Sequence, residues 1–246
     1  RKKGYEVTLI EKHGDLGGRA RTFLHNNYKY DAGPTVITAP YLIDELFSIH
    51  SEKLSDYVNL LPVKPWYRFL FENGEYLDYG DKLSTTVKEI KLKYGYENAR
   101  SYLKLVKHSK RIFNKAFIEL SDEPFESLGS MVKHLPELIR IRFDRSVYQA
   151  VDKYIGNKNL NQALSMHPLL VGGNPYSTTS IYLLIQYLEW KWGVFYAEGG
   201  TGKIVDGLEK LLLNKDVEIK KNTEAHKIIV SKNKVIGVET NEGIIS

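Results

Sequence analysis

The sequence of 246 residues contains no cysteine. This absence excludes disulfide bonds, thiolate zinc sites and a cysteine nucleophile. It also fits a reducing compartment, so we expect a cytoplasmic location. No apolar run approaches the roughly 20 residues that a helix needs to span a bilayer, and the sequence therefore predicts no transmembrane helix.

Several common site patterns are missing as well. None of the seven histidines forms a His-x-x-x-His or His-Glu-x-x-His pair, so no metal site is predicted. The nucleophile elbow Gly-x-Ser-x-Gly does not occur. The glycine-rich run that ends at Lys203 lacks the spacing of a Walker phosphate loop, and no Ser or Thr follows that lysine.

The composition is that of an ordinary globular chain with a basic balance. Hydrophobic residues make up 42% of the sequence, which is enough for a packed core, and charged residues make up 26%. The net charge of +5 has three interpretations, namely a solvated surface, binding to nucleic acid, or attraction to anionic lipid. No nucleic-acid partner is expected, because no helix-turn-helix, zinc-finger or RNA-binding signature accompanies the charge.

The first twenty residues resemble the second half of a dinucleotide-binding βαβ unit. A strand is predicted over residues 6–10, followed by Glu11 and by a turn that contains Gly17, Gly18 and Arg19. A carboxylate at the carboxyl end of such a strand can accept ribose hydroxyl protons. The two glycines permit close approach of the backbone, and the arginine offers a planar fork for phosphate oxygens. The alternative is an ordinary edge strand that ends in a surface glutamate and a tight turn.

The position of Glu11 bears on where the chain begins. In the usual unit the acidic residue lies about 20 residues after the glycine loop, whereas Glu11 is only ten residues after Arg1. We therefore expect the sequence to start inside the crossover helix and to be a fragment of a larger protein.

Periodicity divides the chain into three regions, which we expect to be domains or parts of domains: 1–81, 82–195 and 196–246. The first is predicted to be rich in strands and the second in helices, and the third returns to mixed structure. The predicted strands are 6–10, 21–24, 28–31, 67–71, 76–79, 217–220, 227–231 and 234–240. The predicted helices are 41–49, 85–94, 99–121, 126–135, 146–155, 160–167, 178–192 and 202–213.

Several blocks, in order along the chain, carry a family resemblance. They are Leu16-Gly17-Gly18-Arg19-Ala20, Tyr30-Asp31-Ala32-Gly33-Pro34-Thr35, Arg145-Ser146-Val147-Tyr148, Val171-Gly172-Gly173-Asn174-Pro175-Tyr176 and Gly199-Gly200-Thr201-Gly202. With these blocks the sequence resembles the bacterial-type phytoene desaturases, which are FAD-dependent carotenoid desaturases in the amine-oxidase-like flavoprotein group. The Gly-Gly-Arg motif marks only the broad group, whereas the Val-Gly-Gly-Asn-Pro and Gly-Gly-Thr-Gly blocks indicate carotenoid and related polyprenoid desaturases.

The resemblance implies a fold and an activity. The implied fold class is α/β (α+β), an incomplete Rossmann-like FAD-binding domain interrupted by a helical insertion that binds substrate and contacts the membrane. The implied activity is FAD-dependent dehydrogenation of a polyprenoid such as phytoene by the intact protein, with this fragment alone inactive. Two alternatives stay open, a flavin-dependent carotene cis–trans isomerase and a non-catalytic lipid-binding module of the same fold.

The resemblance also implies site residues. The residues expected to bind FAD are Glu11, Lys12, Gly17, Gly18, Arg19, Ala20, Asp31, Gly33, Pro34, Thr35 and Ala225. Of these, Asp31, Gly33, Pro34 and Thr35 are expected near the isoalloxazine, and Ala225 near the adenine. The residues expected at the substrate tunnel and reaction centre are Arg145, Asn174, Tyr176, Gly200 and Thr201.

A basic helix is a candidate membrane contact. Within residues 103–117, Lys104, Lys107, Lys110 and Arg111 interleave with an apolar stripe. Such a helix can lie in a membrane interface, but it is also typical of a cationic surface helix on a core. Residues 136–143 are a second candidate. We expect peripheral membrane lipid and a carotenoid-type substrate as partners, while the oligomeric state stays open.

Overall fold

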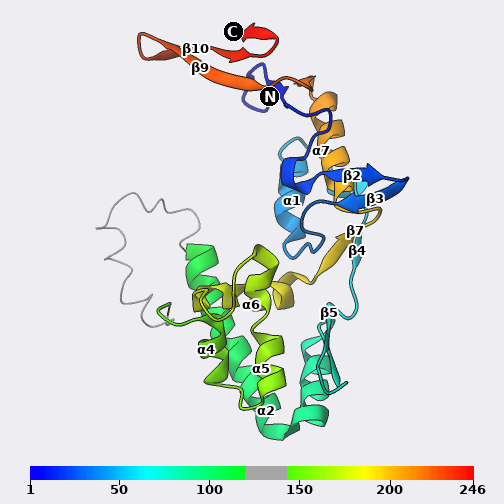
Figure 1. The fold of residues 1–246 in the computed structure, drawn as a ribbon, viewed down its shortest axis with the longest axis vertical. Coiled ribbons are helices and arrows are strands. Elements are labelled where there is room, and N and C mark those ends of the chain that lie inside the picture. Colours follow the sequence, from blue (N-terminus) through cyan, green and yellow to red (C-terminus); the bar gives the residue numbers. More distant parts are fainter. Residues whose placement is uncertain (120–142) are drawn as a thin grey trace. The chain divides into compact units, whose positions relative to one another are not determined.

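The computed structural model describes residues 1–119 and 143–246, which form two compact units (Figure 1). The first unit combines Arg1–Leu61 with Phe195–Ser246, and the second is Pro62–Val194. We had placed the first boundary at residue 81. The structure places it earlier, because the hairpin of β5 (Tyr67–Leu70) and β6 (Tyr76–Tyr79) packs on helix α2 (Leu83–Phe113) within the second unit.

The first unit is built from small sheets. Strand β1 (Thr8–Ile10) pairs in parallel with β8 (Glu218–Lys220), with Leu9 opposite Ile219. Strands β2 (Thr22–His25) and β3 (Tyr28–Asp31) form an antiparallel hairpin. Strand β10 (Lys234–Thr240) pairs antiparallel with both β9 (Ala225–Ser231) and β11 (Gly243–Ile245). Strands β4 (Leu60–Pro62) and β7 (Phe195–Ala197) form a further two-stranded sheet.

Two hairpin turns of this unit follow from their residue types. Asn26 and Asn27 join β2 to β3 with φ angles of 48° and 64°, and Lys232 and Asn233 join β9 to β10 with 48° and 59°. A two-residue turn with positive φ at both positions matches the right-handed twist of the paired strands, and asparagine tolerates this conformation better than most residues. The two turns join the strands predicted at 21–24 and 28–31, and those predicted at 227–231 and 234–240.

Two helices and two short 3₁₀ turns complete the first unit. They are η1 (Gly18–Ala20), α1 (Pro40–Ser48), η2 (Leu54–Asp56) and α7 (Gly202–Asn214). Proline suits the first turn of α1, where an N–H group would have no helical partner. The core side chains come from residues 37–58, β7 and α7, and are Ile37, Phe47, Leu54, Val58, Ala197 and Leu211.

The second unit is mainly helical. Its elements after the β5–β6 hairpin are α2 (Leu83–Phe113), η3 (Asn114–Glu119), α4 (Val147–Asp152), α5 (Lys158–Leu164), η4 (His167–Val171), η5 (Ser180–Leu183) and α6 (Leu184–Trp192). Ser146 begins α4 with a capping box, since its hydroxyl accepts from the Gln149 N–H and the Gln149 side chain accepts from the Ser146 N–H. Helices α2 and α6 pack on each other in the core.

Helix α2 joins two helices that we had predicted separately, 85–94 and 99–121. The break between them persists as a kink at Gly95, whose φ of 86° and ψ of 168° are not helical. Beyond the kink, the apolar stripe is buried in the core through Leu105, Val106, Ile112 and Phe113. Most of the stripe predicted as a membrane contact is therefore a core face, although Leu103 is 45% exposed and meets solvent beside the charged face.

The remaining differences from the predicted elements involve very short strands. Strands β4, β7 and β11 are each three residues long and were not predicted. The helix predicted at 126–135 lies outside the described residues, as does most of the membrane candidate at 136–143. None of the helices in the part of the chain that the structure describes has an apolar stretch long enough to cross a bilayer.

Candidate functional site

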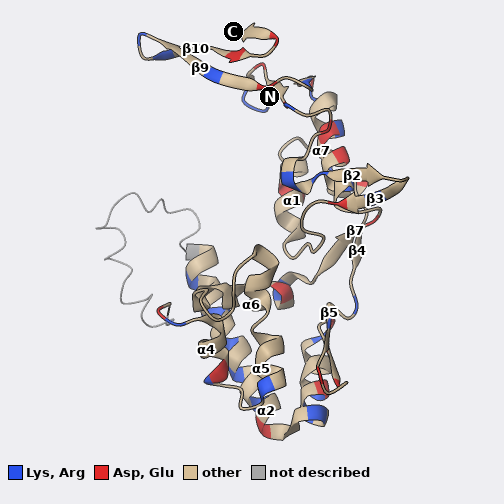
Figure 2. Cartoon of the chain, viewed as in Figure 1, with Lys and Arg blue, Asp and Glu red and all other residues tan. Residues whose placement is uncertain are grey.

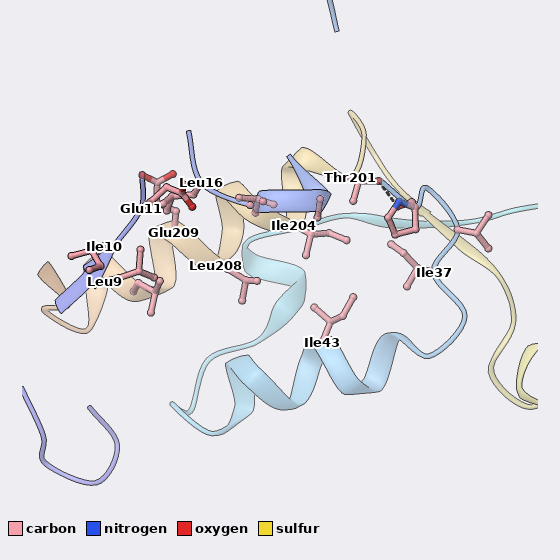
Figure 3. Close-up of a pocket in the computed structure, with 17 residues that line it drawn as sticks. Leu9, Ile10, Glu11, Leu16, Ile37, Ile43, Thr201, Ile204, Leu208 and Glu209 are labelled. Carbon is pink, nitrogen blue, oxygen red and sulfur yellow. Dashed lines mark hydrogen bonds between the residues drawn. The ribbon is translucent and has the colours of Figure 1, made fainter. Parts of the chain in front are cut away.

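A pocket of about 700 Å³ lies in the first unit at the carboxyl end of β1 (Figure 3). Its walls are the end of β1, the glycine turn that follows, the segment from Pro34 to Ile37, and one face of α7. The lining is mainly aliphatic, and its ionisable groups are Glu11 and Glu209. The expected residues Gly17, Gly18, Ala20 and Thr201 also line it.

Glu11 is held at the mouth of this pocket by backbone contacts. Its N–H donates to the Lys220 carbonyl on β8, and its carbonyl accepts from the Thr223 N–H at 2.8 Å. Its Oε1 atom accepts a hydrogen bond from the His13 N–H at 2.9 Å, and the residue is half-buried. A carboxylate fixed in this way can accept further protons from a hydroxyl-bearing ligand in the pocket.

The glycines of the motif are required by close packing. Gly17 has a φ of 106°, and a Cβ atom there would lie 2.8 Å from a Val205 methyl group on α7. At Gly33, a Cβ atom would collide with the carbonyl oxygen of Arg19. Substitution at either position would therefore push apart the elements that form the pocket wall.

Asp31 connects the β2–β3 hairpin to the start of α7. Its carboxylate accepts hydrogen bonds from the Thr22 hydroxyl at 2.8 Å and from the Thr201 N–H at 3.0 Å. Thr201 in turn donates from its hydroxyl to the Pro34 carbonyl at 2.8 Å. Burial acts to raise the pKa of Asp31, but the hydrogen bonds from Thr201, Thr22 and Gly202 outweigh it and lower the pKa.

Pro34, also expected at the cofactor, lines this pocket, whereas the remaining expected residues do not. Lys12, Arg19 and Thr35 are exposed and do not line it. Ala225 is exposed on β9, opposite Thr240 of β10. Their expected contacts with FAD stay predictions.

The expected reaction-centre residues are divided between the two units. Gly200 and Thr201 are buried in the first unit, while Arg145, Asn174 and Tyr176 belong to the second. Arg145 is half-buried, and its carbonyl accepts a hydrogen bond from the Ser180 N–H at 2.7 Å.

Asn174 and Tyr176 line a second pocket, of about 610 Å³, that lies wholly within the second unit. Its remaining lining residues are Tyr148, Gln162, Ser165, Met166, Leu169, Gly172, Gly173 and Pro175. The Asn174 side chain accepts from the Tyr176 N–H at 2.9 Å, and the Tyr148 and Tyr176 rings lie 4.6 Å apart. The arrangement offers an apolar and aromatic surface with few polar groups, which suits an apolar ligand.

Sequence reasoning missed the aliphatic walls of both pockets. On α7, Ile204, Leu208 and Leu212 face the first pocket at a spacing of four residues, which is a visible helical signal. Tyr148 and Met166 gave no such signal, because the turn that brings them beside Tyr176 has no simple periodicity. In the described residues, no group of three or more His, Asp or Glu side chains could hold a metal ion.

A model of the flavin containing amine oxidoreductases matches residues 1–244 of the chain. The chain belongs to this family. A lycopene-forming phytoene desaturase from Pseudescherichia vulneris is 38% identical over 242 residues, which are 98% of this chain and 49% of that enzyme. A neurosporene-forming phytoene desaturase from Rhodobacter capsulatus is 32% identical over 98% of this chain and 46% of its own length.

Solved structures agree on the fold. An oxidoreductase from Methanosarcina mazei superposes with a TM-score of 0.61 at 16% identity, over 99% of this chain and 52% of that one. The chain thus spans about half the length of the relatives that it matches. Family membership supports FAD as the cofactor, and the mixed α/β architecture with a helical insertion agrees with the expected fold class.

The contacts of Asp31 generate a prediction on stability. Asp31→Asn should lower the free energy of unfolding by about 1–3 kcal/mol near neutral pH, the range for lost hydrogen bonds to a charged group. Because the folded-state pKa is lowered, this stabilisation is present above the unfolded-state pKa near 3.8 and is lost as the pH falls through the folded-state pKa. Urea unfolding from neutral to acid pH measures both effects.

The control for this experiment is Asp15→Asn, because Asp15 is exposed in the neighbouring glycine turn. The control should change stability little at any pH. A difference between wild type and Asp31→Asn that stays the same under acid conditions would contradict the assigned role of the Asp31 carboxylate.

Proposed function

We propose that the protein is an FAD-dependent desaturase of a carotenoid or a related polyprenoid. The observation that carries the proposal is that the chain aligns over 98% of its length with phytoene desaturases from several bacteria. Two pockets of different chemistry support it. One combines a fixed carboxylate and glycine-rich backbone with aliphatic walls, and the other combines aromatic and aliphatic surface with a few polar groups.

The residues of the first pocket fit the nucleotide part of FAD. Glu11 presents a half-buried carboxylate at a strand end, the position from which such a group accepts ribose hydroxyl protons. The glycine turn leaves room for close approach at Gly18, where an added Cβ atom would meet no heavy atom within 4 Å. Lys12 and Arg19 are exposed beside this turn and can supply positive charge for phosphate.

The second pocket fits part of an apolar chain. Met166 and Leu169 provide aliphatic surface, and the Tyr148–Tyr176 ring pair provides flat faces against which a polyene or isoprenoid segment can pack. The desaturation removes a hydride and a proton from adjacent saturated carbons and leaves a new double bond. A bound flavin would supply the redox chemistry by accepting the hydride with its two electrons, and the proton would be released to solvent. The chain's own residues would bind and orient the substrate.

Pigment formation in cells tests this proposal. The intact protein, expressed in cells that supply phytoene, dehydrosqualene or lycopene, should lengthen the conjugated polyene of one of these and shift its absorbance to longer wavelengths. Chromatography of the extracted pigments distinguishes new double bonds from cis–trans isomers of the same mass. Unchanged mass with altered isomer composition would reject desaturation in favour of isomerisation.

Glu11 is the cofactor residue whose contribution is measured most directly. Glu11→Ala in the intact protein should weaken FAD binding by about 1–3 kcal/mol, because charge-assisted hydrogen bonds to the ribose would be lost. Titration of the apoprotein with FAD, followed by flavin fluorescence, gives the affinity. Glu6→Ala is the matched control, since Glu6 is exposed just before the same strand. Equal affinities for wild type and Glu11→Ala would remove Glu11 from the site.

We also propose that the protein binds membranes peripherally through the charged face of α2. Arg100, Lys104, Lys107 and Arg111 are exposed and recur every three or four residues, which places them on one stripe. Figure 2 colours the Lys and Arg positions of the chain blue. Each cation near an anionic leaflet contributes about 1 kcal/mol. Because most of the apolar stripe of this helix is buried and only Leu103 of its apolar residues within 103–113 is exposed, the contribution of α2 should be mainly electrostatic.

Vesicle flotation tests this membrane contact. The intact protein should float with anionic vesicles at low salt and detach as salt screens the charges. Replacing Lys104, Lys107 and Arg111 by glutamate should abolish flotation. The control reverses three exposed lysines on the β9–β10 hairpin, Lys227, Lys232 and Lys234, with the same change in net charge. Equal losses in both variants would indicate a general charge effect and would reject α2 as the contact.

A further inference from the structure

A carboxylate is buried in the core of the second unit and lines neither pocket. Glu189 on α6 is 0% exposed, and its Oε1 atom accepts a hydrogen bond from the Tyr67 hydroxyl at 2.7 Å. Its Oε2 atom lies 3.0 Å from Nε2 of His167, which is 1% exposed. Breaking a buried pair of this kind is strongly destabilising, because the remaining partner is left without compensation.

Aromatic side chains from three elements surround the pair. The Tyr79 ring of β6 lies 6.2 Å from the His167 ring, and the Tyr102 hydroxyl of α2 contacts that of Tyr79 at 3.4 Å. Burial, and to a lesser degree the nearby Glu189, raises the pKa of the Tyr67 hydroxyl, so this phenol stays a donor. Within the described residues, Nδ1 of His167 has no hydrogen-bond partner. The bond to Glu189 is therefore the polar contact that orients the ring.

His167 is the first residue of η4, the turn that leads into the second pocket. The Pro168 carbonyl accepts from the Gly173 N–H at 2.8 Å, and the Leu169 carbonyl accepts from the Gly172 N–H. Gly172 ends the turn with a φ of 74°. These bonds fold the segment back on itself, directly after the buried histidine.

The far end of the same segment is attached to another element. The Pro175 carbonyl accepts a hydrogen bond from the Tyr148 N–H of α4 at 3.0 Å. The segment from His167 to Tyr176 is thus held to α6 at one end, through the buried pair, and to α4 at the other. Between these two attachments lie Leu169, Gly172 and Asn174, which line the second pocket.

We infer that His167 and Glu189 are positioning residues, which hold the 167–176 segment in the conformation that forms the second pocket. The inference rests on the proposed function only in taking that pocket as the place where the polyprenoid binds. The competing interpretation is that the pair contributes to the stability of the core and nothing else. The two differ in whether the effect of removing the pair is local to the segment or spread over the unit.

A double substitution separates stability from positioning. Replacing both partners of a buried hydrogen bond by apolar residues is often nearly neutral for stability, because no unpaired group is left. His167→Leu/Glu189→Leu, made in a Tyr67→Phe background so that the Tyr67 hydroxyl is not left without its acceptor, should therefore fold with a melting temperature close to that of Tyr67→Phe alone. Tyr67→Phe is the matched control, since it removes the other partner of Glu189 and leaves the contact with His167 in place.

Hydrogen exchange with mass spectrometry on the intact protein reads out the segment directly. In the double variant, peptides that cover 167–176 should exchange at least about tenfold faster, because a local opening has become easier, while peptides from α4 and the β5–β6 hairpin stay within about twofold. Tyr67→Phe should leave the 167–176 peptides unchanged. The single variant Glu189→Gln keeps the side-chain shape and can still hydrogen-bond His167, so its 167–176 peptides should retain most of the wild-type protection.

Two results would overturn the inference. One is wild-type protection of 167–176 in the double variant, and the other is faster exchange to the same degree throughout the second unit. Steady-state kinetics with the polyprenoid that wild type converts is an independent readout, in which the double variant should raise KM several-fold and leave kcat within about twofold. If exchange changes locally but wild type converts no polyprenoid, the proposed function fails and the positioning role stands.

Discussion

The parallel pairing of β1 with β8 is the interaction on which the first unit depends. It joins Thr8 to Glu218, 210 residues later, and their side chains are hydrogen-bonded at 3.1 Å. Glu11 owes its position to the same pairing, because Lys220 and Thr223 contact its backbone. The chain between β1 and β8 must therefore leave the first unit and return to it. Most of that intervening chain is the second unit, which folds compactly around a buried core of its own.

Contacts local in the sequence were predictable, and contacts made by distant segments were not. The β2–β3 hairpin and the β5–β6 hairpin were expected within one residue, since alternating side chains and turn residues specify them. Strands β4 and β7 were missed, because each is three residues long and exists only through pairing with a segment more than a hundred residues away. The same dependence on distant contacts explains why the predicted boundary at residue 81 differs from the observed one after Leu61. Nothing in the β5–β6 sequence indicates that its apolar face packs on α2.

The candidate site shows the same contrast between local patterns, which the sequence predicts, and contacts from distant segments, which it does not. Gly17, Gly18 and Ala20 were expected at a ligand and do line the first pocket, since a glycine motif after a strand is a local pattern. Asp31 is expected near the flavin ring, which stays a prediction, and its hydrogen bonds to Thr22 and Thr201 connect the hairpin to α7. Gly200 lies against that carboxylate, where a Cβ atom would approach to 2.9 Å. The Gly-Gly-Thr-Gly block is thus required by packing, whatever further part it plays at the cofactor.

Charged residues show most clearly what a sequence alone leaves undecided. Glu189 stands between Leu188 and Trp190, with Lys191 and Trp192 following, and a glutamate in such a helix is ordinarily assigned to its solvent face. Its burial becomes favourable only when Tyr67 and His167 arrive from elements 122 and 22 residues away. The cations of α2 have the opposite outcome, because the core takes the apolar stripe of that helix and leaves Arg100, Lys104, Lys107 and Arg111 in water. In both helices, the elements that pack against the helix determine which of its faces is buried. An internal charge with two hydrogen-bonded partners then fixes the geometry of its surroundings, while a row of solvated charges remains available to an external surface.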